Sequence, residues 1–150
     1  MSAPFRILVA EDDPNDVMLL KRAFFKAGVD AVMDYVRDGQ EVIDYLEGNP
    51  PFDAPEEAPL PNLLLLDLKM PRVDGLEVLR WLQRQPFLHR LPVMVFSSSN
   101  QPEDLQEAYS LGAASYVVKP HDAQEFMEVV AALKRYWVQI NVPPPDFAPS

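Results

Sequence analysis

The sequence feature that most constrains the fold is a run of four leucines, Leu63–Leu66, which ends at Asp67. A strand that is apolar on both faces belongs in the middle of a parallel sheet, between two layers of helices. Met70-Pro71 and then Val73–Gly75 turn the chain directly afterwards. We therefore expect Asp67 at the carboxyl end of a central strand, where open α/β sheets place their sites. An aspartate that only caps the next turn would fit the same stretch.

Strand-like and helix-like segments alternate along the whole chain. The predicted buried strands are residues 5–10, 31–36, 63–66, 92–96 and 115–118, and an amphipathic helical pattern follows each of them. This alternation specifies an α/β fold, a doubly wound five-stranded parallel sheet of the flavodoxin-like type with strand order 2-1-3-4-5. The switch point of that order lies between strands 1 and 3. Glu11-Asp12, which follows strand 1, should therefore meet Asp67 there.

Prolines mark the boundaries of the predicted domain. Residues 49–61 hold five prolines and are interpreted as an extended surface insertion. Residues 141–150 hold four more and are expected to form a tail that cannot be helical. The last helix is expected to continue to residue 140, so we predict one domain over residues 1–140 followed by the tail.

Composition excludes several classes of protein. The formal charge of -10 and the lack of a Lys/Arg block argue against nucleic acid as a partner. No apolar run is long enough to span a membrane, and the N-terminus lacks a signal-peptide pattern. A cytoplasmic protein without membrane contact is therefore expected. Cysteine is absent and His89 and His121 stand alone, so neither a disulfide framework nor a zinc site is expected.

The residues expected at the switch point indicate phosphoryl chemistry. Three carboxylates in one crevice repel one another, and a divalent cation relieves that repulsion. All-oxygen ligands favour Mg²⁺. The hydroxyl of Ser97 and the ammonium of Lys119 follow strands 4 and 5, at the same edge of the sheet. A cation, a hydroxyl and a lysine around a displayed Asp67 can stabilise a transferring phosphoryl group, with Asp67 as the nucleophile. Asp13, a further acid, is assigned to capping the next helix.

The combined motifs resemble those of a known family. They are Glu11-Asp12, Asp67-x-x-Met70-Pro71-x-x-Asp74-Gly75, Ser97 and Tyr116-Val117-Val118-Lys119-Pro120. In this order, and over about residues 5 to 135, they are similar to the receiver domain of two-component response regulators. The resemblance implies a signalling domain rather than an enzyme, with weak self-phosphorylation from small phosphodonors and with autodephosphorylation.

The resemblance also implies a role for each matching residue. Asp67 would accept the phosphoryl group from a histidine kinase. Asp12 would bind Mg²⁺ directly and Glu11 through water, with Asp67 and the backbone carbonyl of Lys69 as further ligands. Ser97 and Lys119 would contact the phosphoryl oxygens, and Tyr116 would be the switch residue. The resemblance also implies a cis peptide bond at Lys119–Pro120.

Within that family, the chain resembles the single-domain regulators that are paired with bacteriophytochromes and cyanobacterial phytochromes. The features that carry this resemblance are the Pro-rich insertion, the long last helix with Trp137, and the absence of an output domain. The predicted partner is therefore a phytochrome-type histidine kinase. A chemotaxis-type receiver and a phosphorelay intermediate remain alternatives.

Two other functions on the same fold are weaker alternatives. A Mg²⁺-dependent phosphatase would use Asp67 as its nucleophile, but it needs a general acid that is commonly an aspartate two residues further on. That position holds Lys69. A flavodoxin-like FMN binder is the other alternative. The acidic crevice argues against it, because it would repel the phosphate of FMN.

The C-terminal region predicts a homodimer. Tyr136, Trp137, Val138 and Ile140, together with Val142 and Phe147 of the tail, are expected to form an exposed apolar end. A second copy that contributes the same patch is the commonest way to cover such a surface. The alternative is a tail that folds back over its own domain.

Overall fold

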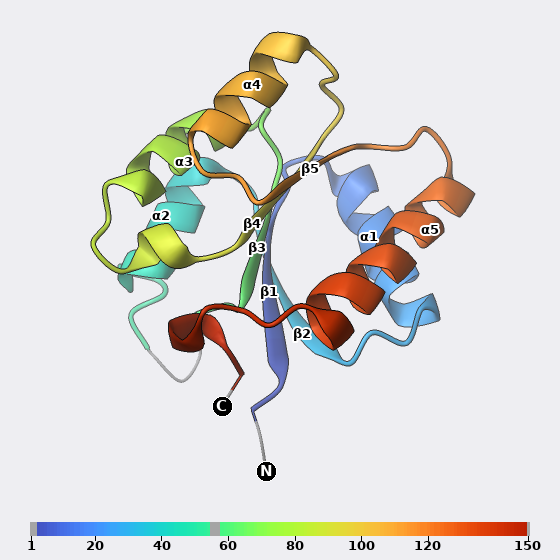
Figure 1. The fold of residues 1–150 in the computed structure, drawn as a ribbon, viewed down its shortest axis with the longest axis horizontal. Coiled ribbons are helices and arrows are strands. Elements are labelled where there is room, and N and C mark those ends of the chain that lie inside the picture. The colour runs from blue at the N-terminus through green and yellow to red at the C-terminus, as the bar shows by residue number, and fades with distance from the viewer. Residues whose placement is uncertain (1–2, 55–57, 150) are drawn as a thin grey trace.

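The computed structural model describes residues 3–54 and 58–149 and shows a parallel sheet with helices on both faces (Figure 1). The strands are β1 (Phe5–Ala10), β2 (Ala31–Val36), β3 (Leu63–Leu66), β4 (Val93–Ser97) and β5 (Ser115–Val118). All neighbouring strands are parallel, and their order is β2-β1-β3-β4-β5. The fold class and strand order predicted from the sequence are therefore confirmed.

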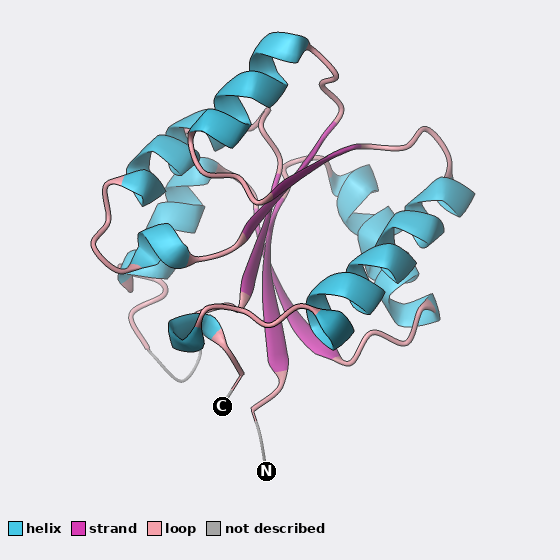
Figure 2. Cartoon of the chain, in the orientation of Figure 1, coloured by secondary structure: helices cyan, strands magenta, loops and turns pink. Residues whose placement is uncertain are grey.

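Within the described residues, five α-helices cover the sheet in two layers (Figure 2). They are α1 (Pro14–Lys26), α2 (Gly39–Glu47), α3 (Gly75–Gln83), α4 (Pro102–Ser110) and α5 (Ala123–Leu133). Figure 1 shows α1 and α5 side by side on one face and α2, α3 and α4 on the other. A 3₁₀ turn, η1 (Leu88–Arg90), precedes β4. None of the helices within the described residues is long and apolar enough to cross a membrane.

The leucine run of β3 packs into both layers, as its all-apolar sequence requires. Leu64 and Leu66 belong to the core cluster under α2 and α3, and Leu63 and Leu65 to the cluster under α1 and α5. No leucine of the run is more than 2 % exposed. Alternate side chains of a strand point to opposite faces, so β3 is held from both sides and its carboxyl end has a fixed position.

Aspartates cap α1, α2, α3 and α5, which begin near this end of the sheet. Asp13 caps α1 by accepting from the backbone N–H of Asn15 at 2.9 Å, in agreement with the capping role predicted for it. Asp38 caps α2, Asp74 forms a capping box with Glu77 at α3, and Asp122 caps α5. These bonds satisfy N–H groups that a helix start leaves free, and they define where each loop ends.

Gly75 lets α3 begin directly against β3. A Cβ atom at this position would lie 2.3 Å from the carbonyl oxygen of Asp67, which is closer than any side chain can approach. The Gly75 N–H also donates to the Leu68 carbonyl at 3.0 Å. The turn after Asp67 is therefore tight, and it fixes the backbone on both sides of that aspartate.

The C-terminal region differs from the prediction in three respects. The α-helical part of the last helix ends at Leu133, and residues Lys134–Ile140 continue as a π-helix, η2. The tail contains one 3₁₀ turn, η3 (Pro145–Phe147), although four prolines argued against any helical structure. A single turn of this kind needs only i→i+3 bonds and accepts proline at its first position.

The third difference is the position of Phe147, which was expected to be exposed. Phe147 is 2 % exposed, and the centroid of its ring lies 5.0 Å from that of Phe87. The Asn62 amide donates to its carbonyl oxygen at 2.6 Å, and Arg90 pairs with Asp146 at 3.0 Å. The tail therefore folds back over its own domain, as the alternative prediction had it.

The Pro-rich insertion packs against the same core cluster as Phe147 of the tail. Phe52 packs on Tyr45 with ring centroids 5.2 Å apart, and the Tyr45 hydroxyl lies 3.0 Å from the Pro59 carbonyl. Residues 55–57 of the predicted insertion lie outside the described residues.

Candidate functional site

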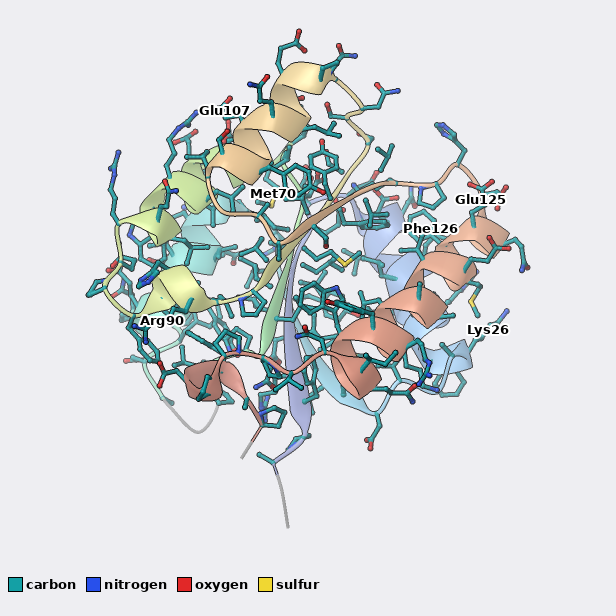
Figure 3. All side chains as sticks on the ribbon, viewed as in Figure 1. Lys26, Met70, Arg90, Glu107, Glu125 and Phe126 are labelled. Carbon is teal, nitrogen blue, oxygen red and sulfur yellow. The ribbon has the colours of Figure 1, made fainter. Side chains whose placement is uncertain are left out.

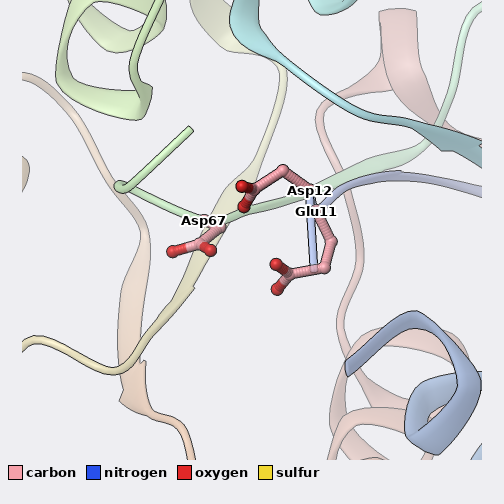
Figure 4. A group of neighbouring side chains, drawn as sticks. All are labelled: Glu11, Asp12 and Asp67. Carbon is pink, nitrogen blue, oxygen red and sulfur yellow. The ribbon is translucent and has the colours of Figure 1, made fainter. Parts of the chain in front are cut away.

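Three carboxylates meet at the carboxyl end of β1 and β3, where the switch point of the sheet lies. Glu11 and Asp12 follow β1, Asp67 follows β3, and one carboxylate oxygen of each lies within 4.8 Å of the others (Figure 4). The Asp67 N–H donates to the Ala10 carbonyl at 3.1 Å, which extends the pairing of the two strands to the site. Glu11 and Asp67 are buried and Asp12 is exposed, so the cluster opens to solvent on the side of Asp12.

The ammonium of Lys119 is the cation that faces this cluster in the structure. Its Nζ atom lies 2.6 Å from Glu11 Oε1, 3.0 Å from Asp67 Oδ2 and 2.8 Å from Asp16 Oδ2. The Lys119 N–H donates to the Ser97 carbonyl at 2.8 Å, so the end of β5 is fixed beside β4. One positive charge thus faces several negative ones, and the site retains a net negative charge.

The cis peptide expected at Lys119–Pro120 is not present. Among residues 3–54 and 58–149 the cis bond is Pro50–Pro51. The two isomers of a bond before proline differ by only about 0.5–1 kcal/mol, so local sequence does not decide between them.

The environment changes the acidity of Glu11 and Lys119. Burial raises the pKa of Glu11 to about 7, and the neighbouring charge of Asp67 adds to this, while Lys119 acts in the opposite direction. Burial alone would lower the pKa of Lys119. Its hydrogen bonds with Asp16 and Glu11 and the charge of Asp67 outweigh burial, so the pKa of this ammonium is raised and it stays charged.

Ser97 and Tyr116 lie on neighbouring strands at the same edge of the sheet. Ser97 is fully buried at the end of β4, and its hydroxyl accepts from the Ser99 N–H at 3.3 Å. The half-buried Tyr116 of β5 donates its hydroxyl to the Ser99 carbonyl at 2.8 Å. Ser99 therefore connects both side chains through its backbone.

The loop from Asp67 to α3 is held at two places. The Lys69 N–H donates to Asp67 Oδ1 at 3.2 Å, and the Lys69 ammonium lies 3.7 Å from Asp104 at the start of α4. Arg72 has a φ of 64° and contacts both carboxylate oxygens of Asp38, at 2.9 and 3.2 Å. This two-point contact lets a non-glycine residue keep a left-handed backbone.

The structure brings Glu11, Asp12, Asp67 and Lys119 together, and it places Ser97 and Tyr116 on the neighbouring strands β4 and β5. It also adds one residue that sequence reasoning missed. This residue is Asp16, an acid in the first turn of α1, which contacts Lys119 at 2.8 Å. Its position three residues after the cap Asp13 is the one signal in the sequence, since that places it near the carboxyl edge. Which lysine reaches it depends on the tertiary fold.

The donor set of the cluster fits a divalent metal ion. Three carboxylates that converge from two strands supply hard oxygen ligands, and the exposed side at Asp12 leaves room for water. Lys119 already neutralises part of the charge of Glu11 and Asp67 in this structure. An incoming cation therefore has to compete with the ammonium for these two carboxylates.

Comparison with known proteins identifies relatives across almost the whole chain. Residues 7–131 match the family described as the response regulator receiver domain. The probable methanogenesis regulatory protein FilR2 of Methanothrix harundinacea is 38 % identical over 94 % of this chain and 88 % of its own length. The response regulator Rcp1 of Synechocystis is 30 % identical over 91 % of this chain and 90 % of its own length.

Solved structures show the same relationship. The response regulator RPA3017 in red light signalling of R. palustris superimposes with a TM-score of 0.88 at 35 % identity, covering 93 % of this chain and 98 % of its own. The phosphorylated cyanobacterial phytochrome response regulator RcpA gives 0.87 at 31 %, covering 95 % and 99 %. The Mn²⁺-bound form of Rcp1 gives 0.85 at 30 %, covering 94 % and 99 %.

Proposed function

Because the chain belongs to the response regulator receiver domain family, in which phosphoryl acceptance is the general function, we propose that Asp67 is its acceptor. The observation that carries this proposal is the position of Asp67, which is buried at the end of β3 with its Oδ2 atom 3.0 Å from Lys119 Nζ. A carboxylate in such a place is held in position, and the ammonium beside it can stabilise the charge of an incoming phosphoryl group.

The donor we propose is the phosphohistidine of a histidine kinase. An Asp67 carboxylate oxygen forms the new P–O bond while the P–N bond to the imidazole breaks, and the electron pair leaves with the imidazole nitrogen. Lys119 stays charged at neutral pH and is placed to offset the charge that builds up on the phosphoryl oxygens. Small phosphodonors can react in the same way, and water can later hydrolyse the acyl phosphate.

The metal ion we propose for the site is Mg²⁺, held by Glu11, Asp12, Asp67 and the backbone carbonyl of Lys69. The three carboxylates that converge within 4.8 Å support this assignment, as does the Mn²⁺-bound structure of the related Rcp1. When bound, the ion would neutralise negative charge at the site of phosphoryl transfer. The protein's own part is to hold the carboxylates close together before the ion arrives.

Phosphorylation is proposed to act through Ser97 and Tyr116. The phosphoryl group would attract the Ser97 hydroxyl, and Tyr116 would then move inward and lose its bond to the Ser99 carbonyl. Because Tyr116 is half-buried on the edge strand β5, its movement would change the surface of β5 and the helices beside it.

The kinase is proposed to be of the phytochrome type. RcpA is a phytochrome response regulator and RPA3017 belongs to red light signalling, and both align with this chain over more than nine-tenths of its length. A histidine kinase takes its phosphoryl group from ATP, so we propose a cytoplasmic location. The charge of -10 argues against a direct role in nucleic-acid binding.

We also propose that the chain forms a homodimer through the exposed apolar residues near its C-terminus. Tyr136 and Ile140 of η2 and Val142 of the tail are each at least half exposed. Trp137 and Phe147, which the sequence placed in the same patch, are core residues instead. The patch that a second copy would cover is therefore smaller than the sequence suggested.

The replacement Asp67→Asn tests the central assignment. It keeps the size and hydrogen-bonding capacity of the side chain but removes the nucleophilic oxygen, so acetyl phosphate with Mg²⁺ should leave no phosphate adduct in intact-mass spectrometry. Asp13→Asn is the matched control, because asparagine caps helices as well as aspartate does and this variant should phosphorylate like the parent. An adduct at full yield in Asp67→Asn would refute the proposal.

A further inference from the structure

Asp16 binds Lys119 from outside the carboxylate cluster. Its Oδ2 atom lies 2.8 Å from Lys119 Nζ, and its side chain is 20 % exposed. Asp16 comes from the first turn of α1, whereas Glu11 and Asp67 come from the ends of β1 and β3. It does not belong to the group of carboxylates whose oxygens converge within 4.8 Å. Lys119 therefore has two kinds of partner, of which only one lies in the predicted metal site.

A divalent cation in the cluster would affect these two kinds of partner differently. The cation and the ammonium compete for Glu11 and Asp67, because both are positive and both bind to these two carboxylates. Asp16 is outside this competition. If Asp16 were absent, the ammonium would have to share its remaining carboxylate partners, Glu11 and Asp67, with the cation. Its side chain is only 9 % exposed, so water could not fully replace the contacts that it loses.

We propose that Asp16 is a positioning residue that keeps Lys119 in place beside Asp67 while the cation occupies the cluster. The inference rests on the proposed function of the site and adds to it. The ammonium of Lys119 contacts Asp16 on one side and the carboxylates of the cluster on the other. Asp16 thereby lowers the cost of metal binding and leaves the ammonium within reach of a phosphoryl group on Asp67.

The simpler account is that Asp16 only stabilises the helix. It is the third residue of α1, where a negative charge interacts favourably with the helix dipole. Any acid removed from this corner of the protein would also weaken cation binding through long-range attraction alone. Neither effect depends on Lys119, so an experiment that includes Lys119 separates them from the proposal.

The experiment measures the Mg²⁺ dissociation constant by calorimetry in a double-mutant cycle. Asp16→Asn and Asp13→Asn each remove one charge from the start of α1, but the Asp13 carboxylate does not contact Lys119. Asp16→Asn should weaken Mg²⁺ binding about fivefold more than Asp13→Asn does, a coupling in the range found for groups in direct contact. In a Lys119→Met background the two variants should bind Mg²⁺ with equal affinity.

Two results would overturn the inference. In the first, Asp16→Asn and Asp13→Asn weaken Mg²⁺ binding equally in the parent, which means that the contact with Lys119 has no role. In the second, the larger effect of Asp16→Asn persists in the Lys119→Met background, which means that Asp16 acts on the cation directly. The mass-spectrometric assay of Asp67→Asn tests separately whether Asp67 is the acceptor, so a failure of that proposal can be told apart from a failure of this inference.

Discussion

Glu11 is a buried acid whose raised pKa connects metal binding to pH. Its pKa is about 7, against an ordinary value of 4.5, because burial and the charge of Asp67 disfavour the ionised form. The folded protein therefore holds this proton more tightly than the unfolded chain does. Without metal, the contribution of Glu11 to stability declines as the pH rises from about 4.5 to about 7.

This pKa predicts the pH dependence of Mg²⁺ affinity. The cation requires the ionised carboxylate, so affinity should fall by up to about tenfold per unit as the pH drops below 7 and should level off above it. Calorimetric titrations between pH 5.5 and 8.5 measure the slope. Glu11→Gln cannot release this proton, so its affinity should be lower at high pH and its slope shallower. Identical slopes in both proteins would show that another group controls the dependence.

The strands β4 and β5 carry the pair that would communicate phosphorylation to the surface. In this structure Tyr116 donates to the Ser99 carbonyl at 2.8 Å, and Ser97 accepts from the Ser99 N–H at 3.3 Å. Both bonds involve the loop after β4, which leads to the start of α4. A change in the position of Ser97 would therefore reach Tyr116 through the backbone of Ser99.

Ser97→Ala should separate phosphorylation from its effect. The variant keeps Asp67 and Lys119, so it should still form the phosphate adduct, but it lacks the hydroxyl that the phosphoryl group would attract. NMR chemical shifts around Tyr116 on addition of beryllofluoride, a phosphoryl mimic, should be large in the parent and reduced in Ser97→Ala. Equal shifts in the two proteins would remove Ser97 from the mechanism.

Local signals in the sequence were sufficient for the five strands and for several helix starts, but not for the end of the last helix. The apolar run Leu63–Leu66 predicted a central strand, and Asp13 predicted the cap of α1. The π-helix Lys134–Ile140 was not foreseen, because its apolar residues continue the same spacing that an α-helix would show. Periodicity indicates which face of a helix is apolar. It does not reveal whether the backbone hydrogen bonds join residues four or five positions apart.

Across the whole chain, the sequence predicted the place of the site better than its contacts. Strand order follows from the alternation of elements, and it brings Glu11 and Asp67 to one edge. The partnership of Asp16 with Lys119 spans 103 positions and depends on the reach of one side chain. The contact of Asn62 with Phe147 spans 85 positions in the same way. Neither pair leaves a local pattern that sequence reasoning could use.

The folded-back tail changes how the proposed homodimer can be tested. Truncation before η2 would remove Trp137 and Phe147 from the core, and the loss of a buried aromatic side chain costs about 3–5 kcal/mol. A truncated chain would then fail for reasons unrelated to association. Substitutions of exposed side chains avoid this problem, and the structure identifies Tyr136 and Ile140 as half exposed.

We therefore predict that the double substitution Tyr136→Ser and Ile140→Ser weakens the dimer without unfolding the protein. Both side chains expose apolar surface that a symmetric partner would bury, so their loss removes part of the driving force for association. Phe25→Ser is the control, because Phe25 is 87 % exposed and belongs to α1 rather than to η2 or the tail. Light scattering at tens of micromolar, with and without beryllofluoride, should give a dimer for the parent and for Phe25→Ser and a monomer for the double variant. A monomeric parent under both conditions would refute the dimer, and a double variant that stays dimeric would place the interface on another surface.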